Sequence, residues 1–83
     1  MSSSTSTPLV LKGNEFANSS VFVNCIVPSG QVLIEVETDS GSGVYNTLST
    51  VTTPQMFHYH CPNAQVNTRI TPSGGATVII PAL

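Results

Sequence analysis

Apolar residues in this chain come in short runs, and inside those runs they alternate with polar residues. In the clearest run, Gln31–Thr38, every second residue is a branched aliphatic one. These residues are Val32, Ile34 and Val36, and the positions between them are Leu33, Glu35 and Glu37. A period of two is that of a β-strand with one buried face. The pattern therefore predicts a half-buried strand whose acidic residues face outward.

Six other runs predict strands of the same kind. They cover Leu9–Lys12, Val21–Val27, Val44–Leu48, Gln55–Cys61, Gln65–Thr71 and Ala76–Ile80. Glycine, proline and asparagine separate most of the runs, and these residues favour turns. No stretch has the period of about 3.6 residues that marks an amphipathic helix. The sequence thus predicts an all-β fold: a single small antiparallel β-sandwich or barrel of about seven short strands over residues 9–83.

The first eight residues, MSSSTSTP, have no periodicity and carry only hydroxyl side chains between Met1 and Pro8. Such a segment has no apolar face to bury, so residues 1–8 are predicted to form a flexible arm. Composition leaves open whether the arm reaches onto a neighbour or is a terminus without a role. The segment also lacks the charged and apolar stretches of a secretion signal, so we expect synthesis in a cytosol.

Charged side chains are scarce. They are Lys12, Glu15, Glu35, Glu37, Asp39 and Arg69, whereas serine and threonine together supply 21 of the 83 residues. Two basic residues are too few to neutralise a phosphate backbone, which argues against nucleic-acid binding. No apolar run approaches the roughly 20 residues of a membrane-spanning helix. A surface of neutral hydrogen-bonding groups does not repel its neighbours, and it suits lasting contact with other proteins.

The small size of the chain points the same way. The core of a domain of 83 residues contributes only a few kcal/mol of net stability. There is no zinc-ligand cluster and no Trp to strengthen that core. Oligomerisation, or docking on a larger body, is then the natural further source of stability.

The segment from Gly30 to Ile80 resembles the small β-sandwich modules of tailed-phage virions. The resemblance rests on three stretches: GQVLIEVETDSGSGVYNTL, TTPQMFHYHCPN and VNTRITPSGGATVII. They correspond to an acidic strand with an Asp/Gly hairpin tip, an aromatic strand after a proline, and an Arg-bearing strand followed by a Gly-rich turn and a Val/Ile strand. The chain departs from that pattern at Tyr45, where Trp is commoner, and in its longer hairpin tip.

The resemblance implies a virion structural protein, and within that class a capsid decoration (cement) protein. Such a protein would bind the major capsid protein on the outer capsid surface as an oligomer, by symmetry a homotrimer, and would stabilise the shell. Two alternatives stay open: a carbohydrate- or receptor-binding module of a virion fibre, and a tail or connector subunit. Sugar binding normally uses exposed aromatic rings, and this chain has no Trp and two Tyr.

His58 and His60 are the first candidates for a chemical role. They lie two residues apart in a predicted strand and therefore project from one face, together with Met56. Two imidazoles could bind a transition metal if a neighbour supplied a further ligand. No third ligand stands at a recognised spacing, so surface or interface histidines that donate hydrogen bonds are the preferred interpretation.

Glu35, Glu37 and Asp39 form an acidic stripe on one strand face, and hard cations such as calcium take several oxygen ligands of this kind. The chain has no D-x-D-x-D loop, so a solvated strand face is the preferred interpretation. Such a row of like charges also discourages unwanted pairing of strand edges.

Cys25 and Cys61 lie in predicted strands whose neighbours should face the core, and a disulfide between them is conceivable. We expect two reduced, buried thiols instead. The chain has no G-x-S-x-G elbow, and it is too small for a water-excluding pocket. The sequence therefore predicts no enzyme and assigns no catalytic, cofactor or metal residue.

Overall fold

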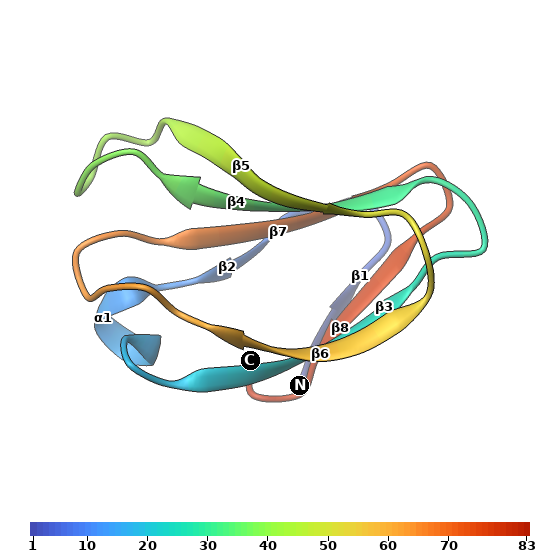
Figure 1. Cartoon of the computed structure of the whole chain (residues 1–83), viewed down its shortest axis with the longest axis horizontal. Coiled ribbons are helices and arrows are strands. Elements are labelled where there is room, and N and C mark those ends of the chain that lie inside the picture. Colours follow the sequence, from blue (N-terminus) through green and yellow to red (C-terminus); the bar gives the residue numbers. More distant parts are fainter.

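The computed structural model describes all 83 residues as two four-stranded antiparallel sheets packed face to face (Figure 1). Sheet A has the order β1 (Ser2–Ser4), β8 (Thr77–Ile80), β3 (Ser20–Ile26), β6 (Gln55–His60). Sheet B has the order β2 (Leu9–Leu11), β7 (Thr68–Ser73), β4 (Gln31–Glu37), β5 (Tyr45–Val51). A one-turn helix, α1 (Gly13–Phe16), joins β2 to β3. The predicted all-β sandwich is confirmed, with eight strands instead of about seven.

Alternation along the central strands fills the space between the sheets. From β3 the inward residues Val21, Val23 and Cys25 are at most 2% exposed. From β4 the inward residues Val32 and Ile34 are at most 4% exposed. One cluster of 14 buried apolar residues results, with contributions from both sheets. The inward faces predicted for these two runs are therefore confirmed at these positions.

The N-terminal segment differs from its prediction as a free arm over residues 1–8. Ser2, Ser3 and Ser4 pair with Ile80, Ile79 and Val78, so they form an edge strand of sheet A. The Ser2 hydroxyl also donates a hydrogen bond to the Leu83 carbonyl at 3.2 Å. The sequence pattern missed this strand because it buries no side chain. Backbone hydrogen bonds hold it, and these leave no mark on side-chain periodicity.

The segment before β7 also differs from its prediction. The strand expected over Gln65–Thr71 begins only at Thr68, and the preceding residues form an irregular loop against α1. A Cβ atom on Gly13 would collide with the carbonyl oxygens of Asn63 and Val66. The N–H of Gly13 donates to the Asn67 side chain at 3.0 Å. The unpredicted turn of helix thus begins at a glycine because no larger residue fits against this loop.

Glu37 corrects the prediction of a solvated acidic stripe. Its side chain is buried, at 8% exposed, and its two carboxylate oxygens accept separate backbone hydrogen bonds. One comes from the N–H of Asn67 at 2.8 Å and the other from the N–H of Gly43 at 3.2 Å. The carboxylate therefore joins the β4–β5 hairpin tip to the loop before β7. Alternation alone could not reveal this role, because the two loops fold over the outer face of the sheet at this point.

The β4–β5 pair contains an irregularity that shapes one edge of the sandwich. Ile34 pairs with Ser49 and Glu35 pairs with Thr47, so Leu48 has no partner on β4. Such a bulge bends its strand and interrupts the ladder. Leu48 is accordingly 61% exposed, although it lies in a strand.

We predict that Ile34→Ala lowers the free energy of unfolding by about 2–5 kcal/mol, because it removes buried methylene groups and leaves a cavity. Leu48→Ala is the control; a substitution at an exposed position should change the free energy by less than about 0.5 kcal/mol. Urea unfolding of both variants checks this. Equal, mild effects would mean that the register of β4 is misassigned.

We also predict that Glu37→Gln destabilises the domain by about 1–3 kcal/mol, since the amide nitrogen of Gln would face a backbone N–H and leave it unpaired. Glu35→Gln should cost at most about 1 kcal/mol, because the partner Arg69 is partly exposed. Thermal unfolding of the two variants measures the difference. A Glu37 variant as stable as the Glu35 variant would contradict the joining role of Glu37.

Candidate interaction face

The six charged residues are distributed unevenly between the two sheets. Lys12 and Glu15 lie at α1, Asp39 lies in the β4–β5 tip, and the other three belong to sheet B. Those three are Glu35 and Glu37 on β4 and Arg69 on β7. Sheet A contains none of the six. One whole layer of the sandwich therefore has no Asp, Glu, Lys or Arg.

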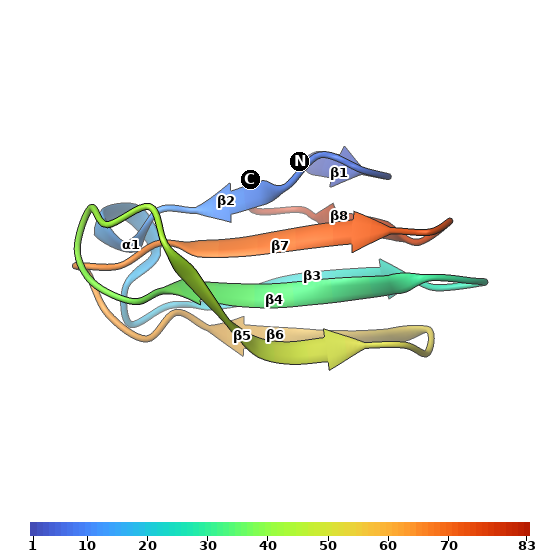
Figure 2. The same ribbon diagram turned by 90° about the horizontal axis from the view of Figure 1, so that it is seen from above.

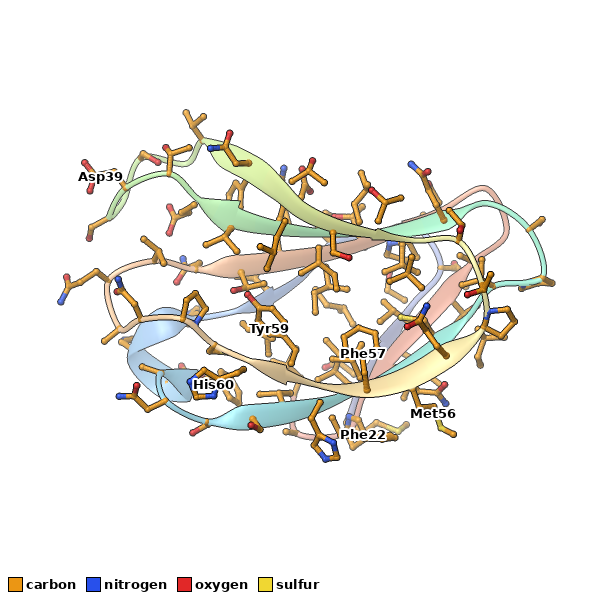
Figure 3. The ribbon with its side chains drawn as sticks, in the orientation of Figure 1. Phe22, Asp39, Met56, Phe57, Tyr59 and His60 are labelled. Atoms are coloured by element: carbon orange, nitrogen blue, oxygen red, sulfur yellow. The ribbon has the colours of Figure 1, made fainter.

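The outer surface of sheet A is apolar at its centre. We call it the charge-free face and define it by seven residues of β3, β6 and β8: Phe22, Asn24, Ile26, Met56, His58, Thr77 and Ile79. Asn24 pairs with Met56 on one side and Ile79 on the other, so these three form a row across the sheet. Met56 is 66% exposed and Ile26 is 44% exposed. Figure 3 shows Phe22 and Met56 on the outside of the sheet, with Phe57 and Tyr59 turned into the sandwich.

The two candidate histidines occupy this side of sheet A. His58 pairs with Phe22, and their rings meet edge to face with centroids 5.4 Å apart. His60 pairs with Ser20 at the end of the same strand pair. No group of three or more His, Cys, Asp or Glu side chains is placed to hold a metal ion. The contact with the Phe22 ring explains the position of the His58 side chain without a bound metal ion.

The outer face of sheet B has a different character. Arg69 Nε lies 3.1 Å from Glu35 Oε1, and its guanidinium carbon stands 4.1 Å from the centre of the Tyr45 ring. The hydrogen bond with Glu35 raises the pKa of Arg69. Glu35 thus faces Arg69, Glu37 faces two backbone N–H groups, and Asp39 accepts from the N–H of Ser40 at 2.8 Å. The three acids have separate partners and form no cage for a cation.

Both cysteines are free and buried, as expected from the sequence. Cys25 lies near the end of β3, whereas the N–H of Cys61 donates to the Ser19 carbonyl just before the start of β3. Six residues of strand, a span of ~20 Å, separate these two places. A disulfide requires Cα atoms within about 7 Å. The strand register therefore rules out the disulfide that the sequence left open.

Two shallow hollows mark the surface. The larger, about 480 Å³, lies against β1 and the linker after it; its lining is Ser3, Ser4, Thr5, Ser6, Thr7, Leu9 and Thr77. The smaller, about 390 Å³, borders the charge-free face at the start of β6; its lining is Asn24, Cys25, Ile26, Pro54, Gln55 and Met56. Neither is lined by a histidine or a carboxylate. Neither hollow therefore brings together an acid, a base and a nucleophile.

The aromatic residues are poorly placed for stacking on sugar rings. None of the five is fully exposed: Tyr59 is buried, and the other four are partly covered. Tyr45, the outer-face tyrosine, lies under Arg69. Sugar-binding platforms need an open aromatic face. This arrangement weighs against the carbohydrate-binding alternative.

Comparison with protein-family models, with curated proteins and with solved structures finds no match for this chain. No helix has the length and apolar character needed to cross a membrane. The seven residues of the charge-free face are thus the clearest candidate for a functional surface. Sequence reasoning singled out His58 of this face but missed the face as a whole, because strand order decides which outward residues become neighbours.

Burial raises the pKa of Cys25 and Cys61 above the ordinary 9.0 and that of Tyr59 above 10.0. The folded state then holds these protons at a pH where the unfolded state has released them. We predict that the free energy of unfolding falls as pH rises above about 9, and that Cys25→Ala weakens the dependence. Urea unfolding between neutral and alkaline pH measures it. A free energy that stays level or rises over this range would contradict the burial of these groups.

Proposed function

We propose that this chain is a virion structural protein that decorates a tailed-phage capsid. In this role it binds the outer surface of the major capsid protein as an oligomer and stabilises the shell. The observation that carries the proposal is the charge-free face, a protein surface with apolar side chains and no ionic group to desolvate. The resemblance of Gly30–Ile80 to small phage sandwich modules supports the phage capsid as the binding partner. The threefold symmetry of the oligomer is taken from that resemblance alone.

A surface that binds another protein must give up the water that hydrates its side chains. Burying an ionised side chain at an interface requires a well-placed partner of opposite charge. The charge-free face needs none, since its polar members, Asn24, His58 and Thr77, each need only a hydrogen bond. The centres of stable interfaces are depleted in charge in the same way. Exposed Met56 and Ile26 supply apolar area that gains from being covered.

The outer surface of sheet B is less suited to being covered by a partner. It holds the Glu35–Arg69 ion pair with Tyr45 packed on it. This ion pair is partly exposed, with side chains 34% and 14% exposed, and it would lose its remaining hydration if an interface covered it. In a decorated shell, sheet B would therefore face solvent and sheet A would face the capsid. A bound copy then holds neighbouring capsid subunits together by contact alone, without any chemical step.

The test first looks for a major capsid protein gene in the genome that encodes this chain and then uses capsid shells assembled from its product. We predict that the purified protein cosediments with these shells and raises their melting temperature. Met56→Glu, which places a charge on the charge-free face, should weaken the binding by about tenfold or more, because the charge loses its hydration on contact.

Leu48→Glu is the matched control, because Leu48 is exposed to a similar extent, 61% against 66% for Met56, and lies on sheet B. It should bind like the parent protein. Absence of the parent protein from the shell pellet would refute the decoration role. Equal binding by both variants would show that another surface makes the contact.

A further inference from the structure

The four edge strands of the sandwich differ in how far they are protected against pairing with another chain. Figure 2 shows β1 and β2 along one side of the molecule and β5 and β6 along the other. β1 and β2 have three residues each, too short for a stable ladder. β5 has seven residues but is interrupted by the bulge at Leu48. Short length and bulges are the devices by which natural sheets protect their edges.

β6 has none of these devices. It runs for six residues, Gln55–His60, in unbroken register with β3, and its two flanking prolines, Pro54 and Pro62, lie outside it. It carries no Lys and no other charged side chain. Its only partner in the sheet is β3. Every second residue of such an edge directs its N–H and C=O away from the sheet, toward solvent.

We propose that β6 pairs with β6 of a second copy of this chain. Sheet A of one copy and sheet A of the other then form one continuous antiparallel sheet across a two-fold axis. The properties of the strand favour a second copy as its partner. An antiparallel partner of identical length and regularity satisfies the outward groups of both copies at once, and the arrangement closes after two copies. Because β6 has no charge, the second copy brings no like-charge repulsion to the contact.

The antiparallel arrangement determines which side chains of the two copies would meet on each side of the joined sheet. Residues that face one another in an antiparallel ladder project from the same side of the sheet. Phe57 and Tyr59 of the two copies would thus continue the buried layer, whereas Met56, His58 and His60 would meet on the outside. The two charge-free faces would become one surface of double the extent. The pair is a two-fold contact of the free protein and does not depend on a capsid role. The threefold arrangement implied by the resemblance would be made on the shell, through other surfaces.

The test is made on the free protein, without shells. Sedimentation equilibrium over micromolar concentrations should give a mass of twice 8.7 kDa. Hydrogen exchange should show protection of the alternate β6 amides that β3 does not use, and dilution should remove it. His58→Lys should weaken the dimer by about tenfold or more, because lysine on an edge strand opposes pairing. The control, Thr47→Lys, places the same charge on the other long edge, β5, and should leave the dimer intact.

Two results would overturn the inference. One is a monomer at all concentrations, whatever the protein does on shells. The other is a dimer in which the outward β6 amides exchange freely, because that dimer would be held by a face instead of an edge. Shell binding is measured separately, so failure of the decoration role and failure of the β6 pair can be told apart.

Discussion

The domain depends on a single layer of small, branched side chains packed between two sheets. Val23, Val32, Ile70, Val78 and Ile80 have no exposed surface, and no Trp adds bulk to the layer. Such a core tolerates little error in register, because a shift of one residue would turn a whole strand inside out. The alternation of β3 and β4 and the tight turn residues between strands serve this one requirement. Glu37 adds the polar counterpart, since its carboxylate joins the irregular loops that close one end of the sandwich.

The absence of Asp, Glu, Lys and Arg from the strands of sheet A has a physical consequence for its outer surface. All three charged strand residues lie on sheet B, where Glu35 and Arg69 pair and Glu37 is satisfied by backbone N–H groups. Sheet A is left with hydroxyl, amide, imidazole and apolar groups. The charge-free face has no Asp, Glu, Lys or Arg whose hydration a partner would have to replace, and β6 at its edge has backbone groups that β3 does not pair. Face and edge are separate binding features, and each can be filled without displacing the other.

Much of the fold could be predicted from the sequence, because alternation reports burial directly. It identified the inward faces of β3 and β4, the hairpin tip between β4 and β5, and the free thiols. It failed where backbone or loop contacts decide the structure. β1 is held by main-chain pairing of three serines, α1 begins where Gly13 meets the loop before β7, and Glu37 is buried by segments distant in sequence.

The candidate face was predictable only in part for a related reason. The sequence places Met56 and His58 on one side of a strand, but it does not say that β3 lies beside β6 or that β8 lies beside β3. Strand order is a tertiary property, and it brings Met56, Asn24 and Ile79 into one row. The uneven distribution of charge between sheets becomes visible only when that order is known.

The proposed role is tested most directly by an electron cryomicroscopy reconstruction of capsid shells incubated with this protein. We predict sandwich-shaped density on the outer shell, with the charge-free face of sheet A against the capsid and the Arg69–Glu35 pair of sheet B toward solvent. Density with sheet A facing solvent, or a shell without such density, would contradict it.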